Sequence, residues 1–329
     1  IKIFNTSATA KHENLFVGGV GNDTLTGAQG ADTYLFNRGD GQDVISDVGG
    51  TDKIVFGEGI TAENLDIWVQ PGTKNLLIDI QDPENQSATD RITINSGYQS
   101  NQGRWIERLE FSDGTYLTAE NVLKLAEVRG TANADTISAS AMDDLVKAGD
   151  GNDKITGYIE ANNRMYGEAG DDTISIAANT YSAKYENLFV GGTGNDTLTG
   201  AYSADTYLFN RGDGSDLVYN AYNRDDNTDS LLFSSGVSAD QLWFSRLGND
   251  LIVSVIGTQD KVTIKSWYSG ANNQLDEIRT PSEVLYANQV DQLVSAMSEF
   301  AAPAIGETVL SDDMDTALQP ALAAAWQTA

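Results

Sequence analysis

Residues 13–45 read ENLFVGGVGNDTLTGAQGADTYLFNRGDGQDVI. Taken in groups of nine, this stretch repeats the pattern Gly-Gly-x-Gly-x-Asp-x-U-x, in which U is a large apolar residue. Copies span 18–26 and 27–35, and after a two-residue slip the pattern resumes at 39–45. Residues 186–218 repeat the whole stretch with 27 of 33 positions identical. A copy this close within one chain indicates a structural unit and argues against a chance pattern.

The residue types in the repeat favour calcium binding. Adjacent glycines allow backbone angles that other residues avoid, so a tight turn can point its carbonyl oxygens at a cation. Each Asp adds a carboxylate, and Ca²⁺ prefers about six to eight oxygen ligands in flexible geometry. The x-U-x triplet is a short strand whose apolar side chain enters a thin core. We therefore expect two nonapeptides to make one coil of a solenoid, with turns on both edges and strands on both faces.

This geometry predicts pairing of Asp residues that lie two repeats apart. The spacing is 18 residues for Asn14–Asp32, Asp135–Asp153 and Asn187–Asp205, 19 for Asp153–Asp172, and 20 for Asp23–Asp43 and Asp196–Asp216. A flexible Gly/Asp-rich linker is the alternative, but it would lack an apolar residue at a fixed position. That position holds Leu25, Tyr34, Ile45, Ile137, Val146, Ile155, Ile174, Leu198 and Tyr207.

The repeat resembles the calcium-binding nonapeptide of RTX (repeats-in-toxin) proteins. The chain is similar to the C-terminal part of RTX proteins exported by type I secretion. The resemblance implies an all-β fold with parallel β-rolls that are disordered without calcium and fold around several Ca²⁺ ions outside the cell. Asn163 and Asn187 stand at degenerate Asp positions, where we expect weaker binding. The expected metal-site residues are Gly19, Gly21, Asp23, Gly30, Asp32, Gly41, Asp43, Asp135, Asp144, Gly149, Gly151, Asp153, Gly170, Asp172, Gly192, Gly194, Asp196, Asp205, Gly214 and Asp216.

The duplication sets the domain organisation, since residues 1–127 and 128–329 each hold a repeat block followed by a non-repetitive block. We predict a first roll block at 1–47, a first β-rich cap at 48–127, a second roll block at 128–220 and a second cap at 221–279. Residues 280–329 are expected to hold a capping helix and a C-terminal secretion signal. The non-repetitive blocks resemble the haemolysin-type calcium-binding-protein-related region. Some cap is required because a solenoid end exposes unpaired strand edges.

Local patterns predict the elements of the two caps. Thr61 is expected to cap one helical turn, and Thr118 a short helix through Leu125. Thr280–Glu283 reads as a capping box with Pro281 at the first helical position, which predicts a helix carrying Tyr286 to Phe300. Apolar alternation predicts strands at 65–69, 76–80, 91–94 and 105–111. Residues 229–233, 236–242 and 260–264 match 52–56, 59–65 and 90–94.

The composition limits the classes of partner. A net charge of −28 disfavours nucleic acid and anionic membranes, whereas divalent cations relieve the self-repulsion. The chain has no cysteine, which suits export in an unfolded state, and no apolar run approaches the ~20 residues of a membrane span. It begins at Ile1 without a Met or signal peptide, so we expect a fragment of a longer protein.

Motifs that suggest other functions have simpler explanations. The Arg-Gly-Asp tripeptides at 38–40 and 211–213 lie inside repeat turns, so we interpret them as structural and not as integrin ligands. His12 is the only histidine, which argues against a histidine-rich zinc site, a zinc protease or a serine triad within this chain. We expect no catalytic set, and therefore no enzyme.

The leading hypothesis is a calcium-dependent folding and secretion module of a secreted RTX toxin or adhesin. Its C-terminus would engage the type I secretion machinery. One alternative is a module of a cell-surface adhesin that binds carbohydrate or peptide of a host or surface ligand. In the carbohydrate version, Trp68 and Trp243 could stack on the sugar. We favour packing roles for both tryptophans because each sits in an alternating strand pattern. A second alternative is a calcium-binding accessory of an upstream secreted hydrolase.

Overall fold

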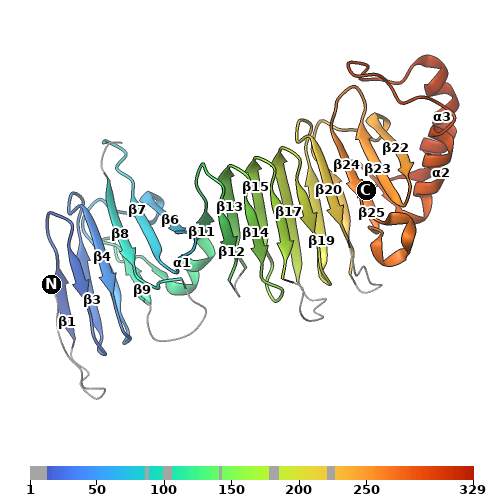
Figure 1. The fold of residues 1–329 in the computed structure, drawn as a ribbon. Helices are drawn as coiled ribbons and strands as arrows, with labels where there is room; N and C mark the ends of the chain where they lie inside the picture. Colours follow the sequence, from blue (N-terminus) through green and yellow to red (C-terminus); the bar gives the residue numbers. More distant parts are fainter. Residues whose placement is uncertain (1–12, 86–88, 99–105, 141–142, 178–184, 221–226) are drawn as a thin grey trace. The chain divides into compact units, whose positions relative to one another are not determined.

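A computed structural model describes residues 13–85, 89–98, 106–140, 143–177, 185–220 and 227–329. Residues 1–17 are predicted to form a degenerate opening turn, and the first twelve of them, including His12, lie outside these ranges, as does Trp105. The chain divides into two compact units, Ile1–Arg129 and Gly130–Ala329. Each is built mainly from short parallel strands (Figure 1), which confirms the predicted all-β parallel solenoid.

The first unit forms two sheets. One has the order β1 (Asn14–Val17), β3 (Asp32–Phe36), β5 (Lys53–Phe56), β9 (Arg108–Glu110) and β10 (Tyr116–Thr118), of which β10 alone is antiparallel to its neighbour. The other has the order β2 (Thr24–Thr26), β4 (Gln42–Ser46), β8 (Asp90–Ile94), β7 (Leu76–Ile80), β6 (Leu65–Val69) and β11 (Glu127–Arg129). The predicted strands at 65–69, 76–80 and 91–94 are confirmed, whereas the one expected at 105–111 is shorter, because only β9 pairs there.

The second unit repeats this plan with more coils. One sheet stacks β13 (Leu145–Asp150), β15 (Arg164–Ala169), β17 (Glu186–Thr193), β19 (Ala204–Phe209), β21 (Ser230–Phe233) and β25 (Glu277–Arg279) in parallel, then β26 (Glu283–Tyr286) and β27 (Trp326–Thr328) antiparallel. The other stacks β12 (Thr136–Ser138), β14 (Lys154–Gly157), β16 (Thr173–Ile176), β18 (Thr197–Thr199), β20 (Ser215–Tyr219) and β24 (Lys261–Ile264) in parallel, then β23 (Asp250–Val255) and β22 (Leu242–Leu247) antiparallel. The order β20-β24-β23-β22 repeats β4-β8-β7-β6 of the first unit, as the matched sequences predict.

The thin core lies between the two sheets of each unit. All nine residues at the repeat's apolar position are 2% exposed or less, as predicted. Along β3 and β19 every second residue is buried, which is the period of a strand. Aromatic rings stack from coil to coil, with centroids 4.8 Å apart for Phe16–Tyr34 and 5.0 Å for Phe189–Tyr207.

Short helices mark the caps. The first cap holds η1 (Ala62–Asn64) and α1 (Ala119–Leu125), and the second holds η2 (Ala239–Gln241), η3 (Trp267–Ser269) and η4 (Ala271–Asn273). Thr118 Oγ1 accepts the N–H of Asn121 at 3.3 Å, so this predicted N-cap is confirmed. The helical turn expected after Thr61 is also present.

The C-terminal helix begins later than predicted. Residues Glu283–Tyr286 form β26, so the expected helix start at Pro281 is wrong. The reason is tertiary pairing: β26 lies between β25 and β27 and buries Val284 and Leu285, and this outweighs the local capping signal. The N–H of Glu283 donates to Thr280 Oγ1 within the connecting turn.

Two helices follow this hairpin. These are α2 (Ala287–Met297) and α3 (Asp312–Ala325), which pack on each other before the chain returns to the sheet as β27 (Figure 1). Leu318, Leu322 and Trp326 are buried, so the end of the chain is part of the cap. Among the described helices, none is long and apolar enough to span a membrane.

Candidate metal centre

Turns along one edge of the second unit stack the repeat aspartates of successive coils. The backbone N–H of Asp135 donates to Oδ1 of Asp153, that of Asp153 to Asp172 and that of Asp172 to Asp196, each at 2.7 Å. The N–H of Asp196 donates to Oδ1 of Asp216 at 3.0 Å. The predicted pairs Asp135–Asp153, Asp153–Asp172 and Asp196–Asp216 are therefore confirmed. The pair Asp172–Asp196, which is 24 residues apart, was not predicted. Each accepting carboxylate is fixed against the turn before it. These five residues are the aspartate ladder.

One oxygen of each inner carboxylate in the ladder is left over. The Oδ2 atoms of Asp153, Asp172 and Asp196 are buried and have no hydrogen-bond partner among the described residues. Burial of a carboxylate oxygen without a partner is costly. A Cβ on Gly191 would lie 2.1 Å from Asp196 Oδ2, so glycine keeps the space beside that oxygen open. An all-oxygen donor set of this kind fits a hard cation such as Ca²⁺.

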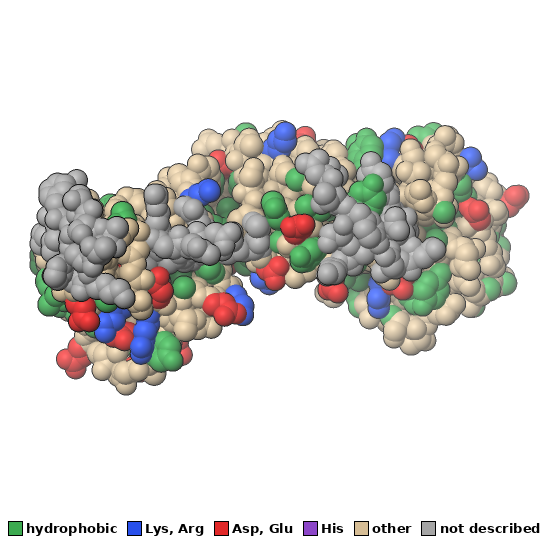
Figure 2. All heavy atoms as spheres, turned by 90° about the horizontal axis from the view of Figure 1, so that it is seen from below, with side chains coloured by type: hydrophobic (Ala, Val, Ile, Leu, Met, Phe, Trp, Pro, Cys, Tyr) green, Lys and Arg blue, Asp and Glu red, His purple; other side chains and the backbone are tan. Residues whose placement is uncertain are grey.

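Electrostatics in the ladder also favour a cation. Burial raises the pKa of Asp172 to about 6, that of Asp196 to about 7 and that of Asp216 to about 8. Bonds from backbone N–H groups oppose the rise, and neighbouring carboxylates add to it. On the face drawn in Figure 2, exposed acidic and basic side chains are interspersed. The ladder is a concentration of negative charge inside the fold, and a divalent ion would neutralise it.

Seven of the expected glycines lie so close to the preceding coil that a side chain would clash with its backbone: Gly41, Gly149, Gly151, Gly170, Gly192, Gly194 and Gly214. Gly194 has φ +146°, and a Cβ there would lie 2.0 Å from the carbonyl oxygen of Gly170 in the preceding coil. Only glycine allows so close an approach. Gly30 is not among the glycines with positive φ, whereas the other nine expected ones are: Gly19, Gly21, Gly41, Gly149, Gly151, Gly170, Gly192, Gly194 and Gly214.

The other edge of the second unit is held largely by side-chain amides. Asn163 Nδ2 donates to Asn187 Oδ1 at 2.8 Å, and Asn187 Nδ2 donates to Asp205 Oδ1 at 2.9 Å. Asp205 Oδ2 accepts the N–H of Ala201 at 2.7 Å, and Asp144 accepts hydrogen bonds from Ser140. The side-chain amide of Asn can donate a hydrogen bond, whereas a carboxylate cannot. On this edge the amides therefore satisfy oxygen atoms that a cation would coordinate in a metal site.

In the first unit the expected residues form shorter versions of both edges. The N–H of Asp23 donates to Oδ1 of Asp43 at 2.9 Å, as in the aspartate ladder. Asp32 is buried, and its Oδ1 accepts from Asn14 Nδ2 at 2.6 Å while its Oδ2 accepts the N–H of Ala28 at 3.0 Å.

The turn at the two-residue slip before Asp43 lies within the roll and contacts the cap. Asp40 is buried and accepts the N–H of Asn37 at 2.8 Å. The N–H of Gly39 donates to Oδ2 of Asp90, at the start of β8, at 2.6 Å. Arg38 donates to the carbonyl oxygens of Gly59 and Gln81, each at 2.9 Å. All three residues of the Arg-Gly-Asp tripeptide at 38–40 therefore make contacts that stabilise the fold.

The second tripeptide has the same role, because the N–H of Gly212 donates to Asp260 Oδ2 at 2.8 Å. Sequence reasoning missed Asp90 and Asp260 as partners of the turns. The only signal was their shared place at the start of the matched segments 90–94 and 260–264.

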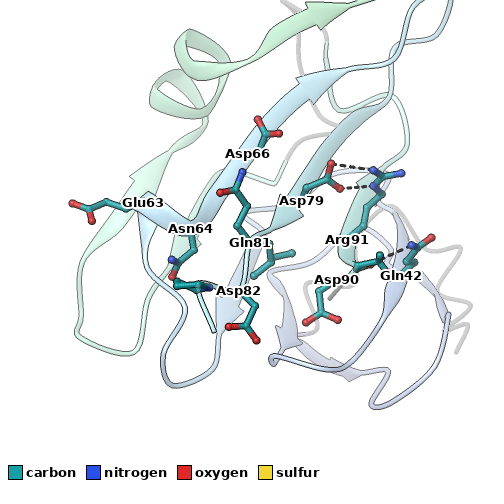
Figure 3. A pocket seen from close by; sticks show the side chains of 12 residues that line it. Gln42, Glu63, Asn64, Asp66, Asp79, Gln81, Asp82, Asp90 and Arg91 are labelled. Atoms are coloured by element: carbon teal, nitrogen blue, oxygen red, sulfur yellow. Dashed lines mark hydrogen bonds and ion pairs between the residues drawn. The ribbon is translucent and has the colours of Figure 1, made fainter. Parts of the chain in front are cut away.

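A pocket of about 700 Å³ opens beside the first cap, with the carboxylates of Asp66, Asp79, Asp82 and Asp90 around it (Figure 3). Asp79 forms an ion pair with Arg91. Trp68 is half-buried next to this pair: its N–H donates to Asp79 Oδ2 at 2.9 Å, and the Arg91 guanidinium lies 5.4 Å from its ring centre. Trp243 is buried in the second cap, which confirms a packing role there.

Comparison with known proteins identifies two families along the chain. Residues 13–43, 129–158, 160–175 and 185–217 match the RTX calcium-binding nonapeptide repeat. Residues 75–121 and 250–280 match the haemolysin-type calcium binding protein related domain.

Two individual proteins are similar to parts of the chain. The iron-regulated protein FrpA of Neisseria meningitidis serogroup C is 34% identical over 99 residues, which are 29% of this chain and 9% of FrpA. The crystal structure of the extracellular lipase LipA from Serratia marcescens aligns with 78% of this chain and 38% of the lipase chain, at 20% identity and a TM-score of 0.28. The chain thus spans well under half the length of either protein.

Proposed function

Because this chain belongs to the RTX calcium-binding repeat proteins, we propose that it is a calcium-dependent folding and secretion module of a larger extracellular protein, a toxin or an adhesin. In the low-calcium cytosol the chain stays unfolded and can be exported. Outside the cell calcium exceeds the roughly 10⁻⁴–10⁻³ M dissociation constants typical of extracellular sites, so binding drives folding.

The observation that carries this proposal is the set of unpartnered, buried carboxylate oxygens on Asp153, Asp172 and Asp196. A pKa shift of one unit corresponds to about 1.4 kcal/mol, so keeping Asp172 and Asp196 ionised at neutral pH costs up to a few kcal/mol each, and partial solvent screening lowers that cost. A domain is stable by only about 5–15 kcal/mol. The ladder therefore makes the folded state marginal or unstable until a cation neutralises it.

The C-terminal end fits a signal that is read before folding. Its helix α3 and strand β27 are docked into the second cap, with Leu318, Leu322 and Trp326 buried. Because this end of the chain forms part of the folded cap, it is free to bind another protein only before folding. We propose that type I secretion machinery binds this end first, and that calcium then folds the emerged chain.

Circular dichroism and calorimetry of the chain, with calcium and with excess chelator, test the proposal. We expect β-structure and a cooperative transition in millimolar calcium, and neither in chelator. Magnesium at the same concentration is the matched control, because Mg²⁺ demands a tighter octahedral shell and should not replace Ca²⁺. A chain that is fully folded in chelator would contradict the proposal.

The alternative roles find less support in the geometry. A sugar platform needs an open aromatic face, yet Trp243 is buried and Trp68 already contacts Asp79 and Arg91. We therefore assign this chain a calcium-binding role and propose no catalytic one. An accessory role beside a hydrolase would use the same calcium-driven folding.

A further inference from the structure

Three buried carboxylates meet where the first roll block passes into its cap. They belong to Asp32 in β3, Asp47 just after β4 and Asp52 just before β5, and they are 0%, 6% and 1% exposed. One carboxylate oxygen of each lies within 4.8 Å of the other two. Asp47 and Asp52 follow residue 43, where the match to the RTX repeat ends in this block. We call these three residues the exit cluster.

Hydrogen bonds satisfy most of the oxygens in the exit cluster. Asp47 Oδ1 accepts the N–H of Gly49 at 2.8 Å, and its Oδ2 accepts the hydroxyl of Tyr34 at 2.5 Å. Asp52 Oδ1 accepts the N–H of Asp32 at 2.7 Å. Asp52 Oδ2 is buried and has no hydrogen-bond partner within the described part of the chain. A buried carboxylate that lacks a partner points to a missing positive group.

The surroundings of the exit cluster are rich in oxygen and negative charge. Burial raises the pKa of Asp52 to about 8, and the nearby carboxylates of Asp47, Glu107 and Asp32 add to the rise. A Cβ on Gly27 would lie 2.1 Å from both Asp47 Oδ2 and Tyr34 Oη, and 2.7 Å from Asp32 Oδ2. These oxygens therefore converge beside a position that only glycine leaves open.

The second unit has an equivalent of the exit cluster in which one residue differs. Asn220 stands where the first unit has Asp47, and it accepts the hydroxyl of Tyr207 at 3.3 Å as Asp47 accepts that of Tyr34. Its Nδ2 donates to Asp229 Oδ2 at 2.9 Å and to the carbonyl oxygen of Gln274 at 3.0 Å. Asp229 corresponds to Asp52, so in the second unit the amide supplies the donor that Asp52 lacks.

We infer that Asp32, Asp47 and Asp52 bind one calcium ion beyond those of the repeat turns, and that the residue at position 47 or 220 decides which unit has this site. The cluster offers only hard oxygen ligands, which suits Ca²⁺ better than a softer metal. In the second unit the neutral amide of Asn220 takes the place of the ion. This inference builds on the calcium-dependent folding proposed above.

Reciprocal substitutions in the full chain test the inference. Asp47→Asn copies the second unit and should lower the number of bound calcium ions by one, measured by equilibrium dialysis at saturating calcium. Asn220→Asp copies the first unit and should raise that number by one. An Asp47→Asn protein that keeps every ion, or an Asn220→Asp protein that gains none, overturns the inference.

Two readouts separate this result from failure of the proposed function. If the unsubstituted chain folds on calcium but Asp47→Asn loses no ion, only the exit site is refuted. If the unsubstituted chain binds no calcium, the proposed function fails with it. Circular dichroism in saturating calcium shows whether each variant folds. Should Asp47→Asn not fold, Asp52→Asn replaces it, since it keeps the Oδ1 acceptor for Asp32, and the same loss of one ion is expected.

Discussion

The backbone N–H of Asp172 donates to Oδ1 of Asp196, 24 residues later and one coil further on, at 2.7 Å. The second oxygen of Asp196 is buried and lacks a hydrogen-bond partner among the described residues. One carboxylate thus does two things. Its first oxygen sets the register between coils, and its second makes that register unfavourable unless a cation is bound.

Asp196→Asn separates these two effects. The amide oxygen can still accept the N–H of Asp172, but the charge is gone, so we expect calcium affinity to fall by about tenfold or more. The same change should raise stability in chelator, because this position no longer holds a buried charge. Calorimetric titration measures the calcium affinity, and circular dichroism in chelator measures the folded fraction of the variant and of the unsubstituted chain.

Asp171→Asn is the matched control for this substitution. Asp171 is the exposed neighbour of the ladder and accepts the N–H of Asn195 at 2.8 Å. We expect it to change calcium affinity little. If Asp196→Asn bound calcium as tightly as this control, the ladder would not be the calcium site.

The raised pKa values of Asp196 and Asp216, about 7 and about 8, predict a pH dependence. Their ordinary value is 3.8, so without calcium the folded chain holds protons that the unfolded chain has released. Stability in chelator is therefore highest at the acidic end and falls as the pH rises from about 4 to about 8.

Calcium affinity should change in the opposite direction. Calcium must displace these protons, so its affinity rises with pH over the same window and levels off above it. The folded fraction in chelator, followed by circular dichroism, and calcium titrations, both at pH 5 and pH 8, check the two signs. Chelated protein that is more stable at pH 8 than at pH 5 would refute this account.

The sequence predicts what is local to the nonapeptide. Leu25 and Tyr34 stand at the same position of successive repeats, and each pair of repeats forms one coil. The core residues and the Asp pairs about 18–20 residues apart therefore follow from the spacing of the repeat. Asp90 could not be found this way, because its partner Gly39 is 51 residues away. The prediction of a helix start at Pro281 was wrong for a related reason. Residues 283–286 form a strand because they pair with β27, which lies near the end of the chain.

Gly194→Ala tests the close stacking of turns. The new Cβ would lie 2.0 Å from the carbonyl oxygen of Gly170, and φ is +146°, so both a clash and backbone strain result. Gly212→Ala is the matched control, since φ there is +97° and nothing lies within 4 Å of the new Cβ. We expect the control to lose about 1–2 kcal/mol of unfolding free energy and Gly194→Ala clearly more, by urea unfolding in saturating calcium. Equal losses would show that the turns do not restrict each other.

Arg38→Ala tests the structural role of the first Arg-Gly-Asp tripeptide. Arg38 donates to two carbonyl oxygens at 2.9 Å, whereas Arg211 makes longer bonds of 3.4 Å to the carbonyl oxygen of Gly236 and 3.2 Å to Gln241 Oε1. We therefore expect Arg38→Ala to lower the melting temperature in calcium more than Arg211→Ala does. Each bond to a charged donor contributes about 1.5–3 kcal/mol when buried and less at these partly exposed sites. A larger effect at Arg211 would contradict the structural role assigned to the contacts of Arg38.

Trp326→Ala separates the two roles proposed for the C-terminal end. Trp326 is buried in the second cap with its ring centre 6.3 Å from that of Phe244, so its truncation should cost about 3–5 kcal/mol of unfolding free energy. Export depends on the unfolded chain, in which this contact does not exist, so the amount exported by cells with a type I system should stay the same. Calcium-dependent refolding of the exported chain should become weaker.

Gln327→Ala, at the exposed neighbour, is the control for both readouts. Export that fell with Trp326→Ala while refolding stayed intact would reverse the assignment, because this side chain would then act in recognition by the exporter and not in the cap.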